Sequence, residues 1–143
     1  MADARTELLR RVPLFSGLKR DQLSFVATRV DEVDIPAGRV LVTQGEPNHA
    51  LHIIIDGEAE VSVDQKQRRS LGAGDFFGEI SMLDRRPATA TVRASRPLRL
   101  LVLSHAQFRD AIKGDPDLTM AMLTAMCERL EADAGAKVET PSP

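Results

Sequence analysis

A glycine-rich stretch at residues 72–92 contains the residue types best suited to chemistry in this chain. Three glycines precede an acid and several small residues, in the order Gly72, Gly74, Gly78, Glu79, Ser81, Ala88 and Thr89. Small residues let backbone N–H groups approach a ligand, and free N–H groups at a helix start suit an anion such as phosphate. An adjacent carboxylate can accept hydrogen bonds from ribose hydroxyls. The stretch therefore predicts a sugar-phosphate site; the alternative is an irregular connection with Glu79 as a solvated or capping acid.

The histidines and the single cysteine give weaker signals. His49, His52 and Glu58 fall among predicted strands, and histidine and glutamate can bind a metal. A cupin-type metal enzyme needs two histidines two residues apart on one strand face, whereas these two are three apart and point to opposite faces. Cys127 lies on an apolar helix, where a lone cysteine is more often a small buried side chain than a nucleophile. No catalytic residue and no metal site are therefore predicted, and a cupin-like enzyme is a distant alternative.

Short strands are the elements that must position the glycine-rich stretch. Alternating or β-branched runs, separated by turn signals, predict strands at residues 30–35, 39–43, 51–56, 59–63, 69–71, 90–94 and 98–103. The polar residues 64–68 are expected to be a connection between two of them. Seven or so short strands at this spacing predict a mostly β protein with a jelly-roll fold.

Helical periodicity flanks the strands at both ends. Helices are expected within residues 1–12 and over residues 20–28. Ser104 and Gln107 form a capping box that opens a third helix, and Asp115 before Pro116 opens a last helix over residues 116–132. Because this last helix is apolar on more than one face, we expect it to cover a ligand or a partner. One domain is predicted over residues 13–132, with residues 133–143 as a disordered tail.

Composition and charge exclude several classes of protein. The chain has 143 residues, 43% hydrophobic and 28% charged, as expected for one globular domain. The net charge of −2 and the absence of Trp and Tyr argue against a nucleic acid partner. A single cysteine excludes an intramolecular disulfide, and no apolar run is long enough for a membrane span or a secretory signal. A cytoplasmic protein with no span of its own is expected.

Six segments of the chain resemble the cyclic nucleotide-binding domain family, the modules of catabolite activator protein and of protein kinase A regulatory subunits. Residues 77–92, here called the cassette, are similar to the family's phosphate-binding cassette at residues 77–83, at Pro87 and at residues 90–92. The other matching segments follow in the family's order at residues 14–18, 35–38, 44–47, 55–59 and 71–79. This resemblance implies a jelly roll with N-terminal helices and two C-terminal helices, the last of which is a lid or dimerisation helix.

The resemblance also implies a ligand and roles for particular residues. The ligand would be cAMP or cGMP, with Glu79 accepting a hydrogen bond from the ribose 2′-hydroxyl and backbone N–H groups lining the ribose and the cyclic phosphate. The predicted nucleotide-binding residues are Gly78, Glu79, Ile80, Ser81, Ala88 and Thr89. The predicted lid residues that would contact the base are Thr119, Met122, Leu123 and Met126. No cofactor and no metal are implied.

One cassette position departs from the family pattern. The family has an arginine directly after the cassette proline, where it pairs with the cyclic phosphate, and this chain has Ala88 there. The spacing from Glu79 to Val92 leaves no gap, so the arginine is substituted and not displaced. Loss of a charge-assisted contact worth roughly 1.5–3 kcal/mol predicts about tenfold to over a hundredfold weaker binding. Arg86, two positions earlier, is the candidate to reach the phosphate instead.

Two hypotheses for the function stay open at this point. The first is a regulatory module, not an enzyme, that binds cAMP or cGMP and signals through its last helix to a protein effector. The second is a degenerate domain that has lost nucleotide binding through Ala88 and acts as a protein-interaction or dimerisation module, with a homodimer through the last helix. Neither nucleic acid nor membrane is an expected partner, and no helix-turn-helix is expected after the last helix.

Overall fold

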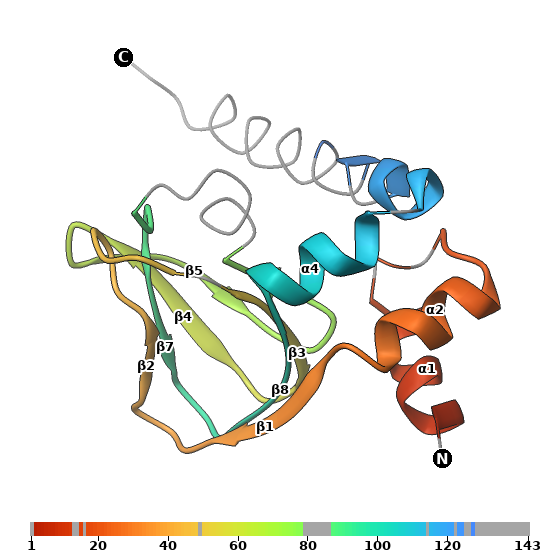
Figure 1. The fold of residues 1–143 in the computed structure, drawn as a ribbon. Helices are drawn as coiled ribbons and strands as arrows, with labels where there is room; N and C mark the ends of the chain where they lie inside the picture. Colours follow the sequence, from red (N-terminus) through yellow and green to blue (C-terminus); the bar gives the residue numbers. More distant parts are fainter. Residues whose placement is uncertain are drawn as a thin grey trace.

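Among the residues that the structure describes, eight strands form two antiparallel sheets of four (Figure 1). The computed structural model describes residues 2–12, 15, 17–48, 50–78, 87–113, 115–121, 123, 124 and 127. The strands are β1 (Asp31–Ile35), β2 (Val40–Val42), β3 (Ala50–Asp56), β4 (Ala59–Val63), β5 (Lys66–Leu71), β6 (Phe76–Phe77), β7 (Thr91–Ala94) and β8 (Leu98–Ser104). The first sheet has the order β1-β8-β3-β6 and the second has the order β2-β7-β4-β5. The predicted mostly β jelly roll is confirmed.

Helices cover one side of the first sheet. They are α1 (Ala2–Arg10), α2 (Arg20–Ala27) and α4 (His105–Ile112), and residues 116–121 are also helical. Figure 1 shows α1 and α2 together at one end of the molecule, with α4 following β8. Within the part of the chain that the structure describes, none of the helices has both the length and the apolar character that crossing a bilayer needs.

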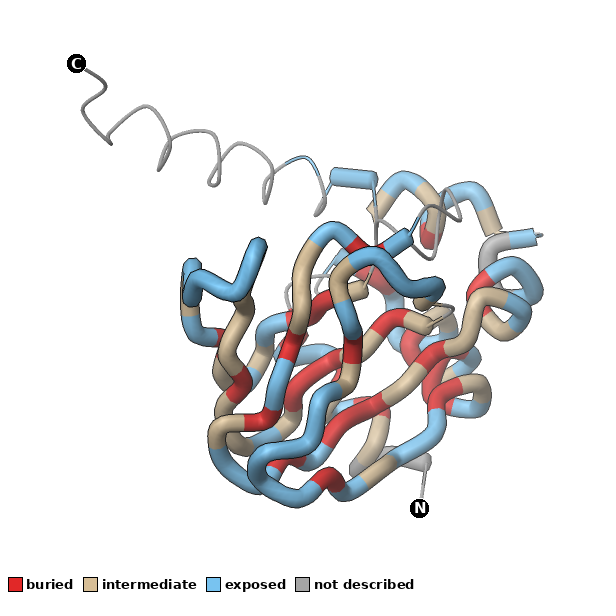
Figure 2. The backbone as a smooth tube through the Cα atoms, turned by 90° about the vertical axis from the view of Figure 1, so that its left-hand side faces the viewer, coloured by how far each residue is buried: buried red, intermediate tan, exposed pale blue. Residues whose placement is uncertain are grey.

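Strands β3 and β8 of the first sheet carry buried residues on both of their faces. Figure 2 shows the buried positions, in red, along the backbone. Leu101 and Leu103 belong to the cluster that the helices cover, whereas Leu98 and Leu100 belong to the cluster between the two sheets. A strand buried on both faces reads as a continuous apolar run, which explains the sequence of residues 100–103. The inner cluster holds Ile35, Val42, Ile54, Ala59, Leu71, Phe77, Ala88, Val92, Ala94, Leu98 and Leu100.

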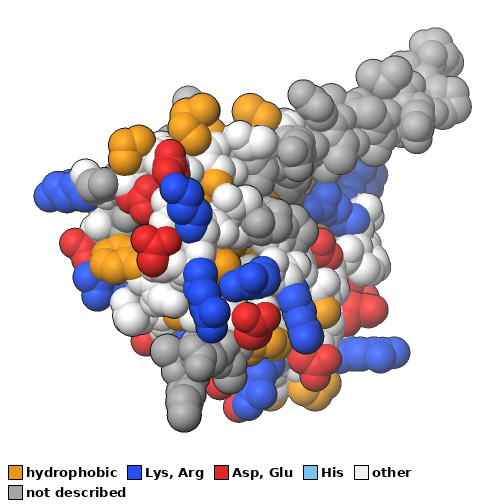
Figure 3. Space-filling view, turned by 90° about the vertical axis from the view of Figure 1, so that its right-hand side faces the viewer, with side chains coloured by type: hydrophobic (Ala, Val, Ile, Leu, Met, Phe, Trp, Pro, Cys, Tyr) orange, Lys and Arg blue, Asp and Glu red, His pale blue; other side chains and the backbone are white. Residues whose placement is uncertain are grey.

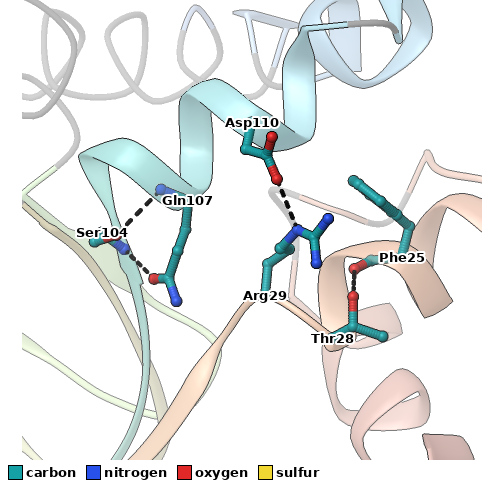
Figure 4. Close-up of polar contacts among 6 residues, drawn as sticks. All are labelled: Phe25, Thr28, Arg29, Ser104, Gln107 and Asp110. Carbon is teal, nitrogen blue, oxygen red and sulfur yellow. Dashed lines mark hydrogen bonds and ion pairs between the residues drawn. The ribbon is translucent and has the colours of Figure 1, made fainter.

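Polar contacts hold α4 at its first residues and again at Asp110 (Figure 4). The Ser104 hydroxyl accepts a hydrogen bond from the Gln107 N–H, and the Gln107 side chain accepts one from the Ser104 N–H, so the predicted capping box is present. Arg29 Nε lies 3.0 Å from Asp110 Oδ2 as an ion pair, although its N–H is not aligned for a hydrogen bond. The Arg29 guanidinium also stacks over the Phe25 ring at 4.7 Å, so α2 and α4 are joined through one side chain.

The prediction of a connection at residues 64–68 was wrong. Strand β5 begins at Lys66, and only Asp64 and Gln65 form the turn between β4 and β5. Both turn residues have positive φ angles, 52° and 67°, as in the two-residue turns whose twist matches a hairpin. Because β5 is an edge strand with exposed polar residues, its sequence lacks the apolar alternation that marked the other strands.

Candidate functional site

The two described ends of the cassette lie on different sheets. Gly78 follows β6 of the first sheet, and Ala88 precedes β7 of the second. Of the predicted site residues, the structure describes Gly78, Ala88, Thr89, Thr119 and Leu123. The predicted residues Glu79, Ile80, Ser81, Arg86, Met122 and Met126 lie outside the described residues. The cassette therefore joins the two layers of the jelly roll at one end of β6.

Gly78 occupies a position that no other residue fits. Its φ of +89° lies in the left-handed region, which side chains rarely adopt. A Cβ atom at this position would lie 2.5 Å from the Ala50 carbonyl oxygen and 2.6 Å from the Asn48 amide nitrogen. The chain entering the cassette therefore runs directly against the start of β3, and this close approach explains the glycine.

Asn48 joins the start of β3 to the cassette. Its Nδ2 donates to the Ala50 carbonyl at 2.9 Å and to the Gly78 carbonyl at 3.3 Å. The second bond spans 30 residues of sequence. Reasoning from the sequence did not single out Asn48, because nothing in the local pattern of residues 44–50 signals a contact so far along the chain.

His52 lies inside the jelly roll, next to the same contact. It alternates with Leu51 and Ile53, so it faces the second sheet, and its ring stacks on Phe77 with 4.7 Å between centroids. Its Nδ1 is buried without a hydrogen-bond partner among the described residues. Burial lowers the pKa of His52 to about 4, and the Phe77 backbone opposes part of this shift. The ring is therefore neutral at physiological pH.

Ala88 is part of the core, with both of its backbone polar groups bonded. The residue is only 6% exposed and belongs to the cluster between the sheets. Its N–H donates to the Glu46 carbonyl at 2.9 Å, and its carbonyl accepts from the Gly45 N–H at 2.8 Å. A longer side chain at this position would therefore replace a buried methyl group of the core.

The loop after β2 holds the end of the cassette in place. Gln44 donates its backbone N–H to the Thr91 hydroxyl at 2.9 Å. Its side chain exchanges two hydrogen bonds with Asp64, donating from Nε2 at 3.0 Å and accepting from the Asp64 N–H at 2.8 Å. These contacts link the residues after Ala88 to the β4–β5 turn. Thr89 itself is exposed.

A polar groove of about 700 Å³ lies on the outer face of the second sheet. It is lined by Gln44, Gly45, Glu60, Ser62, Asp64, Gln65, Gln67, Thr91 and Arg93. Residues of β4 and β7 that alternate with these, Ala59 and Val92 among them, face the core instead. The groove is therefore separated from the interior of the jelly roll by the sheet itself.

The start of the last helix is anchored to α2. Asp115 Oδ1 accepts a hydrogen bond from the Leu118 N–H at 3.1 Å, which confirms the predicted cap, and Gln22 Nε2 donates to the same carboxylate at 3.0 Å. Leu118 is buried in the cluster under the helices. The Thr119 hydroxyl donates to the Asp115 carbonyl of its own helix at 3.3 Å.

Apolar side chains further along this helix are exposed. Met120 is 60% exposed and Leu123 is 48% exposed. On the side of the molecule turned to the viewer in Figure 3, apolar side chains are interspersed with charged ones.

No three His, Cys, Asp or Glu side chains of the described residues form a cluster that could hold a metal ion.

A family model decides which family this arrangement belongs to. The model described as cyclic nucleotide-binding domain matches residues 32–115, more than half of the chain, from β1 to the cap of the last helix. The chain belongs to the cyclic nucleotide-binding domain family. The family that the cassette and its flanking motifs indicated is thereby confirmed.

Individual relatives agree with this cyclic nucleotide-binding domain. The chain is 32% identical over 130 residues to a cyclic nucleotide-gated potassium channel of Mesorhizobium japonicum, covering 91% of this chain and 36% of the channel. It is 33% identical over 103 residues to the cAMP-dependent protein kinase regulatory subunit of Emericella nidulans, covering 71% of this chain and 25% of the subunit. A solved cyclic nucleotide-binding domain from Methylobacillus flagellatus has the same fold, with a TM-score of 0.82 at 22% identity and coverage of 99% and 85%. The chain spans 25–58% of the length of the curated relatives it matches.

Proposed function

We propose that this domain is a regulatory module that binds a cyclic nucleotide at the cassette. The observation that carries the proposal is the position of Gly78, which is held against β3 at a positive φ directly before the acid at position 79. A glycine in this conformation lets the main chain that leads into Glu79 run directly against β3, and this contact sets where the cassette begins. Within residues 13–132, the proposed binding residues are Gly78, Glu79, Ile80, Ser81, Ala88 and Thr89.

The chemistry of the ligand follows from the proposed donors and acceptors. Backbone N–H groups of the cassette bind the cyclic phosphate, and the Glu79 carboxylate accepts a hydrogen bond from the ribose 2′-hydroxyl. The relatives include a cAMP-dependent kinase subunit and a cyclic nucleotide-gated channel. The proposed ligand is accordingly cAMP or cGMP. The interior of the jelly roll on this side is apolar and aromatic, with Phe77 and the neutral His52 ring.

A second candidate function is favoured by the burial of Ala88. The residue replaces the family's phosphate arginine, and its N–H is already bonded to Glu46. A domain without this charge could have lost its ligand and act as a protein-interaction or dimerisation module. Arg86 is the proposed replacement cation in the first hypothesis and has no such role in the second.

The proposed output is the last helix. Its first turn is held by the Gln22–Asp115 contact, while Met120 and Leu123 are exposed and available to a protein effector or to a second copy of the chain. Thr119, Met122, Leu123 and Met126 are the proposed contacts to the base when this helix closes over the ligand. The module is proposed to act inside the cell without enzymatic activity, nucleic acid binding or a membrane span of its own.

Calorimetric titration of cAMP and cGMP into four proteins separates the two functions. These are the wild type and the variants Glu79→Ala, Arg86→Ala and Ala88→Arg. We expect the wild type to bind and each alanine variant to bind about tenfold to a hundredfold more weakly, because each loses a charge-assisted hydrogen bond. If the wild type gives no heat at millimolar ligand while Ala88→Arg binds, the degenerate module is the correct function.

A further inference from the structure

Asn48 holds two carbonyl groups that belong to different parts of the fold. One is the carbonyl of Ala50, the first residue of β3, at 2.9 Å from Nδ2. The other is the carbonyl of Gly78, at 3.3 Å, which belongs to the peptide bond that leads into Glu79. The amide is partly buried between them. A single NH₂ group therefore bridges the start of β3 and the start of the cassette, next to the backbone pairing of His52 with Phe77.

The same amide group fills the space that a side chain at position 78 would need. A Cβ on Gly78 would lie 2.6 Å from Asn48 Nδ2, 2.5 Å from the Ala50 carbonyl oxygen and 3.4 Å from His52 Nδ1. Gly78 thus packs against Asn48, the Ala50 carbonyl group and the His52 ring, whose Nδ1 is buried. The Asn48 bond to Ala50 is local, so the first residue of β3 already orients the amide toward Gly78.

A peptide group is planar, and in the trans form its carbonyl and its N–H point to opposite sides. A donor that fixes the Gly78 carbonyl therefore also fixes the plane of the peptide that joins Gly78 to Glu79. We propose that Asn48 is a positioning residue of the nucleotide site, which sets this peptide so that Glu79 meets the ribose 2′-hydroxyl. The inference rests on the proposed function for the role of Glu79, and on the two Asn48 bonds for the rest.

The chemistry of the side chain makes the proposal specific to a donor at this position. Aspartate has almost the same shape, but it would place acceptor oxygens against two carbonyl oxygens, which repel them. Alanine removes the donor, so the carbonyl groups of Ala50 and Gly78 both lose a hydrogen bond. Serine keeps one shorter donor. The residue at position 48 should therefore hold the Gly78 carbonyl best when it is Asn, less well when it is Ser, still less when it is Ala and least when it is Asp.

The test compares cAMP with 2′-deoxy-cAMP in the wild type, Asn48→Ser, Asn48→Ala, Asn48→Asp and the control Thr28→Ala. The control loses a hydrogen bond from the Thr28 hydroxyl to the Phe25 carbonyl at the end of α2, outside the residues that contact Gly78. We expect the wild type to prefer cAMP by about tenfold or more, since the 2′-hydroxyl contact is charge-assisted. Asn48→Ala should reduce this preference to less than about threefold, whereas Thr28→Ala should keep it. A full preference in Asn48→Ala overturns the proposal, because a merely structural loss lowers both affinities equally.

Hydrogen exchange of the ligand-free protein gives a second readout, which is independent of the proposed function. Backbone amides at residues 78–81 should exchange at least about tenfold faster in Asn48→Ala than in Thr28→Ala, because the first variant releases the Gly78 peptide. Equal exchange in the two variants overturns the proposal. If the wild type binds neither nucleotide, the proposed function fails and with it the role at the ribose, while faster exchange still supports the hold of Asn48 on Gly78.

Discussion

Replacing Gly78 with alanine is expected to destabilise the domain by an amount that two structural features determine. The first is the φ of +89°, where an L-residue with a Cβ costs about 1–2 kcal/mol. The second is crowding, since the new Cβ would lie 2.5 Å from a backbone carbonyl oxygen that cannot rotate away. Forcing an extra methyl group into a packed site costs about 1–3 kcal/mol. Together they predict that the free energy of unfolding falls by about 2–5 kcal/mol in Gly78→Ala.

Gly74 offers a matched control for this substitution. Its φ is +93°, close to that of Gly78, but a Cβ built on it meets nothing within 4 Å. Gly74→Ala should therefore lose only the conformational part, about 1–2 kcal/mol. The gain from a stiffer unfolded chain is the same in both variants and cancels from the difference. Urea unfolding at 25 °C measures both values. If Gly78→Ala is no less stable than Gly74→Ala, the crowding argument is refuted.

Two other positions give independent predictions. His52 is neutral in the folded protein with a pKa of about 4, whereas in the unfolded chain its pKa is 6.5. The unfolded state alone therefore binds a proton between these values, so the free energy of unfolding should fall as the pH drops from 6.5 to 4, by up to about 3 kcal/mol. His52→Phe, which keeps a ring against Phe77, should remove this part of the acid dependence measured by unfolding at pH 8 and pH 4.5; an unchanged dependence would assign it to other groups. Ser104→Ala should lower the free energy of unfolding by about 1 kcal/mol through loss of the α4 cap, and a change below about 0.3 kcal/mol in urea unfolding would contradict the capping role.

Local signals in the sequence predicted the features that depend on neighbouring residues. Ser104 with Gln107, and Asp115 before Pro116, mark helix starts because each cap is completed within three residues of its own position. The continuous apolar run in β8 likewise marks a strand buried on both faces. These caps and this strand could therefore be predicted from neighbouring residues alone.

Features that depend on distant partners were not predictable in this way. Strand β6 has two residues and exists only through its pairing with β3. Lys66 starts a strand because β4 pairs with it across a turn of two residues. Asn48 looks like an ordinary loop residue until the fold brings it to Gly78. Ala88 could be identified as a departure from the family pattern, but its burial and its bonds to Gly45 and Glu46 emerge only from the packing of the sheets.

The most direct test of nucleotide binding is calorimetric titration of cAMP and of cGMP into the wild-type protein and into Glu79→Ala. We predict measurable binding of at least one nucleotide to the wild type and at least about tenfold weaker binding to Glu79→Ala, because the carboxylate would lose its bond to the ribose. If neither cAMP nor cGMP gives heat at millimolar concentration with a folded wild-type protein, the proposal that this domain binds a cyclic nucleotide is contradicted.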